Sequence, residues 1–376
     1  MICSSQPRNK FQLRSCTAML CIGLLLLTAQ NSAVACKWCP PDAGPTILRQ
    51  LDAANAGVLA ELIQRADPNA KNPSSEYRVV AVLKGSLADP GMEFTVPLNV
   101  ESPVGSVHLF FSENSANSWK DPLGISSNAS RFLERAAQLP DQGEDPRSDS
   151  RIQRLEFMLP YLASPDRQIA LAAHGEFSAA PYSVIKELKM QLNHRQLVSW
   201  IQSPTTFTPN RRHLFTLLGV CGNRYDYFLV AEALDDRLAS GETVDLEAII
   251  STLLLLGGKQ AFQQVELSLF EREISLSAQR AAVNALRFHA EQDTAIKKQR
   301  VIQIYRQLLL DPKTADYVLG DLARWEDWES LEQVLVLWET RCENRWLRYP
   351  ILEYLKACPL PEAKQALSME FVAGKN

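Results

Sequence analysis

The chain has 376 residues, a formal net charge of −4, a hydrophobic share of 46% and an aromatic share of 8%. A weakly acidic chain without a long basic stripe is a poor nucleic-acid binder, because such binding depends on clustered Lys and Arg that neutralise phosphates. The hydrophobic share excludes a wholly disordered chain, and the length exceeds one ordinary core, so two domains or a repeat array are expected.

The chain opens with the three parts of an export signal. Basic residues within 8–14 precede an uncharged apolar run over 18–29, and the small residues 33–35 follow. The apolar run is shorter than the roughly 20 residues that span a bilayer, so cleavage after Ala35 is expected. We therefore predict a signal peptide over 1–35 and an exported protein that is periplasmic, in the cell envelope or secreted. No transmembrane segment is expected after cleavage.

A cysteine pair, Cys36 and Cys39, stands directly after the expected cleavage site. In an oxidising compartment these two thiols are placed to form a structural disulfide that restrains the new N-terminus. The alternatives are thiol redox chemistry or metal capture through the same pair, and a lipid anchor on Cys36. Pro40 stands where haem attachment needs His, and no second cysteine pair completes a zinc site.

Residues 36–115 are predicted to form a small β-rich domain. A short helix over 46–54 precedes strands over 57–63, 77–83, 93–96 and 106–111. The clearest strand is 77–83, whose β-branched residues alternate, whereas Ala and Leu leave 57–63 ambiguous. Short strands with glycine at the turns indicate a small open barrel or sheet of the OB kind.

The rest of the chain has a helical pattern. Residues 116–150 are predicted to be a linker that contains a helix, and from Arg151 the apolar period changes from two to 3.6. Segment 214–222 resembles segment 250–258, at an offset close to 37 residues, which lies within the range of two-helix repeats. The predicted fold is therefore α+β and multidomain: a small β-barrel or OB-like head followed by a mostly α HEAT-like solenoid over 151–376, whose helix pairs bury their apolar faces by stacking.

The common catalytic signatures are missing from the sequence. It has no His-Glu-x-x-His, no Gly-x-Ser-x-Gly, no phosphate-binding glycine loop and no dinucleotide fingerprint. The five histidines are scattered, and none stands one helical turn from another, so the pattern shows no helix-borne metal pair. They are His108, His174, His194, His213 and His289. The sequence favours a protein without enzymatic activity, cofactor or metal.

One segment has the chemistry of a binding patch: Arg324, Trp325, Asp327 and Trp328. Arg and Trp are enriched at binding hot spots. On one helix the two tryptophans would lie at i and i+3, and Arg324 could pair with Asp327. The competing interpretation is a packed helix end with a surface ion pair. Segment 345–349, which also combines Arg with aromatic residues, has the same two interpretations.

Several segments together resemble a family of exported bacterial proteins of unknown function. They are Gly-Glu-Phe at 175–177, Ala-Pro-Tyr at 180–182, Leu-Gly-Val-Cys-Gly at 218–222, Ala-Leu-Arg-Phe at 285–288, Leu-Leu-Leu-Asp-Pro at 308–312 and Asp-Leu-Ala-Arg-Trp-Glu-Asp-Trp at 321–328, together with the N-terminal cysteine pair. The resemblance implies shared ancestry and architecture, and no activity. The helical part also resembles HEAT-like repeats, a likeness of fold that implies no function by itself.

The β-rich region more weakly resembles the netrin-like barrel of the tissue inhibitors of metalloproteinases. That fold starts with a cysteine at the mature N-terminus and has a strand like 77–83 that runs into Lys84-Gly85. In the inhibitors the α-amine and carbonyl of the first cysteine chelate the protease zinc, a role that only Cys36 could take. This chain departs from the pattern, because it has Cys-x-x-Cys in place of Cys-x-Cys and lacks the later cysteines.

The sequence thus predicts an exported cell-envelope protein that binds or scaffolds a protein partner. Two alternatives remain open: a thiol redox or metal-binding protein acting through Cys36 and Cys39, and a head that inhibits a protease.

Overall fold

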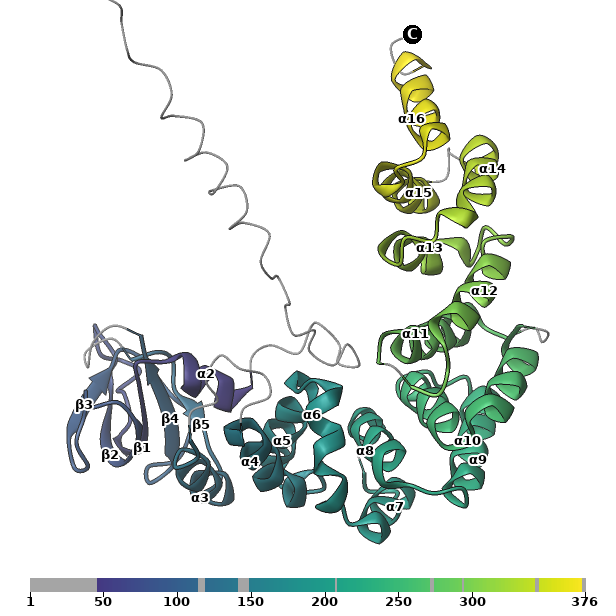
Figure 1. The fold of residues 1–376 in the computed structure, drawn as a ribbon. Helices are drawn as coiled ribbons and strands as arrows, with labels where there is room; N and C mark the ends of the chain where they lie inside the picture. The colour runs from purple at the N-terminus through teal and green to yellow at the C-terminus, as the bar shows by residue number, and fades with distance from the viewer. Residues whose placement is uncertain are drawn as a thin grey trace, which may run out of the picture. The chain divides into compact units, whose positions relative to one another are not determined.

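The computed structural model describes residues 46–113, 119–140, 149–206, 208–270, 274–292, 294–341 and 345–373. One short helix comes first along this part of the chain, a small sheet follows, and the rest is helical (Figure 1). The strands are β1 (Ala56–Gln64), β2 (Ser75–Lys84), β3 (Glu93–Val96), β4 (Val107–Ser112) and β5 (Leu123–Gly124). The α-helices are α2 (Ile47–Ala53), α3 (Ser127–Ala136), α4 (Asp149–Met158), α5 (Arg167–Ala179), α6 (Tyr182–Glu187), α7 (His194–Gln202), α8 (Thr208–Cys221), α9 (Asp226–Ser240), α10 (Leu246–Phe270), α11 (Leu276–Glu291), α12 (Lys298–Leu308), α13 (Ala315–Arg324), α14 (Leu331–Arg341), α15 (Arg345–Ala357) and α16 (Pro361–Ala373). Short 3-10 turns are η1 (Leu159–Tyr161), η2 (Leu188–Met190) and η3 (Trp328–Ser330).

The five strands form one antiparallel sheet in the order β3-β2-β1-β4-β5. The sheet is open, so the predicted barrel is wrong. Closure requires the two edge strands to hydrogen-bond to each other. Here the edges are β3 and β5, with three strands between them, and β5 is only two residues long. Within the described residues these edges do not pair.

The central strand β1 is buried on both faces of the sheet. Val58, Ala60 and Leu62 pack with Tyr77 and Phe110 on one face. Leu59 belongs to the core that also contains the buried residues of α2 and α3. Since successive side chains of a strand point to opposite faces, a strand covered on both sides needs apolar residues throughout. For this reason segment 57–63 does not alternate between apolar and polar residues, and its pattern left the strand assignment ambiguous.

A single apolar core continues from one face of the sheet into the helices. It runs from Leu48 in α2 to Ala363 in α16. The helix expected within 116–150 is α3, whose first turn is capped by Ser126: the Ser126 hydroxyl accepts a hydrogen bond from the Ala129 N–H at 3.0 Å. Phe132 of α3 is buried in this core, so α3 packs with the helices that follow it.

The helices lie in two rows, which confirms the mostly helical character expected from residue 151 onward. In the first row, Thr252 of α10 donates to the Phe215 carbonyl of α8 at 2.8 Å, and these residues are 37 positions apart. Farther along the first row, α11, α13 and α15 pack one after another (Figure 1). In the second row, Tyr227 of α9 bonds Gln264 in the second half of α10. The 37-residue contact matches the repeat offset seen in the sequence.

The helix α10 belongs to both rows because it is broken at Gly258. The backbone there has φ 55° and ψ −131°, far from helical values. Its first half packs on α8, and its second half contacts α9 through Gln264. The chain therefore crosses from one row to the other through a glycine.

Candidate functional site

The cysteine pair Cys36 and Cys39, predicted to form a disulfide or a redox site, lies outside the described residues. Among the described cysteines, Cys221 and Cys358 are free thiols. Burial, followed by the nearby Asp226 charge, raises the pKa of the Cys221 thiol to about 11. A thiol with such a high pKa holds little thiolate at neutral pH and is a weak nucleophile.

The segment from Arg324 to Trp328 does not form one helical face. Helix α13 ends at Arg324, and Glu326 takes the left-handed conformation with φ 58°. The Asp327 N–H then donates back to the Leu322 carbonyl at 2.9 Å, which closes the helix end. The i, i+3 arrangement considered from the sequence is therefore wrong, because the chain turns between the two tryptophans.

The side chains of this segment bind neighbouring helices. Arg324 pairs with Asp321 on its own helix and with Glu291 of α11 at 2.7 Å. Asp327 pairs with Arg306 of α12, so the expected Arg324–Asp327 pair is wrong.

The two tryptophans pack against different tyrosines. Trp325 stacks on Tyr305 with ring centroids 5.3 Å apart, and Trp328 meets Tyr354 edge-on at 5.5 Å. Together with the ion pairs, these contacts tie α11 to α15, as the packed helix-end interpretation expects.

Two histidines that are far apart in the sequence meet between α5 and α8. His174 Nδ1 lies 3.0 Å from His213 Nδ1, His174 Nε2 lies 2.8 Å from the Leu162 carbonyl, and His213 Nε2 lies 2.9 Å from the Ser178 hydroxyl. The Ser178 hydroxyl also donates to the His174 backbone carbonyl at 2.8 Å, so its oxygen is left to accept from His213 Nε2, while His174 Nε2 donates to the Leu162 carbonyl. Burial lowers the pKa of His174 to about 4, and burial together with the His174 and Arg212 charges lowers the pKa of His213 well below 6.5, which favours the neutral form of both rings.

This Ser178–His213–His174 cluster has the order of a nucleophilic triad but lacks a triad's electrostatics. Ser178 lies in the last turn of α5, where helix carbonyl oxygens rather than N–H groups are unpaired. Acyl transfer needs N–H donors beside the nucleophile to stabilise an oxyanion. We therefore interpret the cluster as a structural contact that holds α5 and α8 together. Sequence reasoning missed it because it compared histidines within one helix, although 39 residues is close to the repeat offset.

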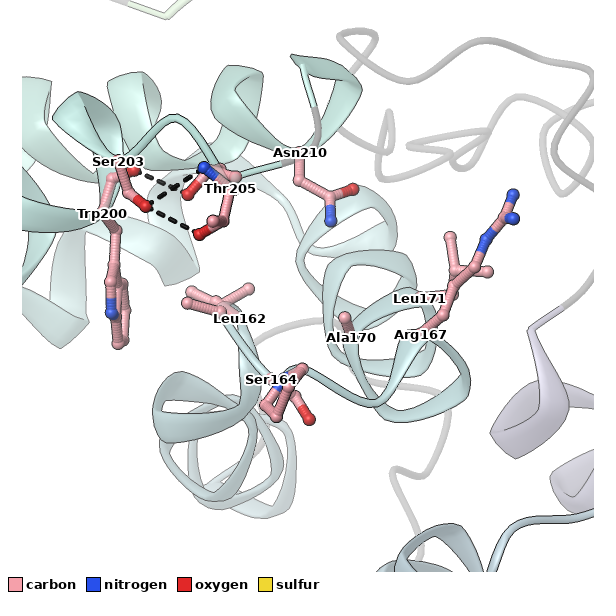
Figure 2. Close-up of a pocket in the computed structure, with 12 residues that line it drawn as sticks. Leu162, Ser164, Arg167, Ala170, Leu171, Trp200, Ser203, Thr205 and Asn210 are labelled. Carbon is pink, nitrogen blue, oxygen red and sulfur yellow. Dashed lines mark hydrogen bonds between the residues drawn. The ribbon is translucent and has the colours of Figure 1, made fainter.

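A cavity of about 650 Å³ opens where α5, α7 and α8 approach one another (Figure 2). Its walls include Leu162, Leu171 and Trp200, and Asn210 points toward the open space. The hydroxyls on its rim are engaged with each other: the Ser203 and Thr205 side chains hydrogen-bond at 2.8 Å. This apolar hollow with a hydroxyl and amide rim can hold a ligand, and nothing in the sequence pattern indicated it.

A network of charged and amide side chains crosses four helices of the first row. Arg212 of α8 lies 3.5 Å from Glu247 of α10. Asn284 of α11 donates to Glu247 at 3.2 Å and accepts from Arg287 at 2.7 Å. Arg287 pairs in turn with Asp321 of α13. Burial raises the pKa of Glu247, and the neighbouring Arg212, Asn284 and Arg287 oppose this shift.

A second cavity, of about 470 Å³, lies beside this network. Arg212, Glu247, Arg280 and Tyr317 are among its lining residues, so α8, α10, α11 and α13 all contribute to it. None of these residues was singled out from the sequence, because the pocket exists only where four helices of the first row meet. We take this cavity and the adjoining network as the candidate functional site, called the first-row pocket below.

Within the described ranges, no three His, Cys, Asp or Glu side chains lie close enough together to hold a metal ion. None of the described helices is both long and apolar enough to traverse a bilayer. No protein-family model, curated protein or solved structure matches the chain. The resemblances found in the sequence therefore stay predictions.

Proposed function

We propose that this chain is an exported cell-envelope protein that binds or scaffolds a partner protein through its helical array, without catalysing a reaction. The observation that carries the proposal is the first-row pocket with its network, to which α8, α10, α11 and α13 all contribute. Stacked helix pairs place equivalent side chains of successive repeats on one surface. Such a surface suits an extended partner that contacts several repeats at once.

The side chains at this surface are suited to recognition. Arginine and amide groups that neighbours hold in place bind a partner with little loss of side-chain entropy. The network residues are already held in this way: Asn284 is fixed by Glu247 and Arg287, and Arg287 by Asp321. The role in the cell envelope is supported by the export signal predicted over 1–35.

The test is an affinity pull-down from envelope extract that compares charge reversal on the first row with charge reversal on α7 and α12. The first-row variant carries Arg280→Glu and Arg324→Glu, at side chains that are about half exposed or more. The matched control carries Arg195→Glu and Arg300→Glu, on α7 and α12. We expect the unmodified chain and the control to capture the same partner and the first-row variant to lose it at least tenfold. Equal capture by both variants, or no partner at all, contradicts the proposal.

A further inference from the structure

The first-row pocket contains an arginine whose guanidinium makes no hydrogen bond among the described residues. The Arg212 side chain is 15% exposed, and its nearest charged partner, Glu247, is 3.5 Å away. Its Nε atom is fully buried and has no hydrogen-bond partner. A guanidinium carries five N–H donors, and buried donors in native proteins nearly always have acceptors. Arg212 therefore points to a missing acceptor.

A second guanidinium, that of Arg280, lines the same pocket. It lies over the Tyr317 ring at 4.5 Å from the ring centroid, and the nearest acid, Asp316, is 3.9 Å away. Stacking on Tyr317 restrains the plane of the guanidinium, although the side chain is 61% exposed. The described residues give Arg280 no hydrogen-bond acceptor either. Both arginines that line this cavity thus have N–H donors without an acceptor among the described residues.

The other groups of the pocket limit what the acceptor can be. Glu247 contributes a carboxylate next to Arg212, so a second negative charge on a ligand would be repelled, and a dianion such as phosphate is disfavoured. The pocket is also lined by Val244 and Leu276, which are 50% and 46% exposed. These apolar side chains match an aliphatic group beside the anion.

We infer that the first-row pocket binds an organic carboxylate attached to an aliphatic chain, with its oxygens accepting from Arg212 and Arg280. This chemistry occurs in an acidic side chain or C-terminus of a partner protein and in a free aliphatic acid. The inference rests on the proposed binding function of the array and names the ligand group at its surface. It accounts for both arginines, whereas the ion pair with Asp321 in the network satisfies Arg287.

The experiment measures binding of small probes to the purified full-length chain by isothermal titration calorimetry. The probes are hexanoate, the neutral isostere hexanamide, inorganic phosphate and an acetylated Leu-Glu-Leu amide. We expect hexanoate to bind at least tenfold more tightly than hexanamide or phosphate. Tighter binding of the peptide than of hexanoate supports a protein segment as the source of the carboxylate. The reverse order supports a free acid and contradicts the protein source.

Three variants locate the binding. Arg212→Gln and Arg280→Gln are each expected to weaken hexanoate at least tenfold, and Arg300→Gln, on an arginine bonded to Glu266 outside the pocket, is expected to leave it unchanged. Circular dichroism checks folding, and the exposed Arg280 keeps the test valid if the Arg212 variant unfolds.

Equal binding of hexanoate and hexanamide, or hexanoate binding that neither arginine variant weakens, overturns the inference. A partner captured through the first row without hexanoate binding refutes the inference and leaves the proposed function standing. Hexanoate binding that needs both arginines, without any captured partner, refutes the proposed protein partner instead.

Discussion

At the scale of single residues, Arg154 holds the start of the described chain to the helices. It pairs with Asp52 of α2 at 2.9 Å and with Glu176 of α5 at 3.0 Å, and both Arg154 and Glu176 are buried. Removing one member of a buried ion pair leaves the other charge desolvated, which costs about 3–5 kcal/mol. We therefore expect Arg154→Met to lower the free energy of unfolding by about this amount in urea titrations. The exposed Arg195→Met is the control, and equal midpoints for the two variants would refute the assignment.

A second residue-scale prediction concerns His289. Burial lowers its pKa from 6.5 to about 4, and its ring contacts Thr294 and the Ser251 carbonyl. Between these two pH values the unfolded chain binds a proton that the folded chain excludes, so stability rises with pH there. His289 thus adds to the loss of stability as the pH falls from 6.5 toward 4, by roughly 3 kcal/mol at most.

The measurement for His289 is urea unfolding at a series of pH values. His289→Gln keeps a donor and an acceptor but cannot be protonated, so its stability should fall less steeply between pH 6.5 and 4. Curves of equal slope for the variant and the unmodified chain would show that His289 is not the titrating group. His174, whose pKa is lowered to a similar value, accounts for part of the slope that remains.

At the scale of elements, two glycines differ in what their backbone requires. Gly241 ends α9 with φ 74° and ψ 9°, a left-handed conformation that Asn also adopts. Gly258 has φ 55° and ψ −131°, a conformation that side chains disfavour strongly. An added Cβ would meet nothing within 4 Å at either site, so only backbone strain differs. Gly258→Asn should cost about 1–3 kcal/mol and Gly241→Asn only a few tenths. Equal losses in thermal unfolding would contradict this difference.

The helix end at Glu326 allows a prediction of opposite sign. Glu326 holds φ 58° without being glycine, and a left-handed L-residue is strained by about 1–2 kcal/mol. Glu326→Gly is therefore expected to raise the free energy of unfolding by about 0.5–1 kcal/mol, after the entropy that glycine loses on folding. The same exchange at Glu332, in the first turn of α14, should destabilise by about 1 kcal/mol. Thermal unfolding of both variants tests this, and a loss of stability at both positions would refute it.

Several elements could be predicted because their patterns are local. The strand β2 and the glycine break in α10 follow from β-branched alternation and from glycine's backbone freedom. Whether one helix continues through Trp325 and Trp328 could not be decided from such local patterns. The turn at Glu326 is enforced by packing, since Trp325 and Trp328 pack against tyrosines of two different helices, α12 and α15. Helical period alone contains no information about such partners.

At the scale of the whole molecule, export can be tested by intact-mass analysis. The predicted signal peptide implies that the protein recovered from a bacterial envelope begins at Cys36. The predicted Cys36–Cys39 disulfide implies that denaturation without reductant exposes three trappable thiols of the remaining five, at Cys221, Cys342 and Cys358. A retained leader would refute export, and five trapped thiols would refute the disulfide.

The amino-acid sequence by itself determined the periods of the strands and helices and the repeat offset near 37 residues, because each depends on neighbours along the chain. The leader stays a prediction from the same kind of local pattern. The tertiary structure decided that the sheet stays open, that His174 meets His213, and that Arg212 and Arg280 line one pocket. The physical reason is that stacking places residues of successive helices within bonding distance, and the partners it selects depend on packing between elements rather than on local backbone preference.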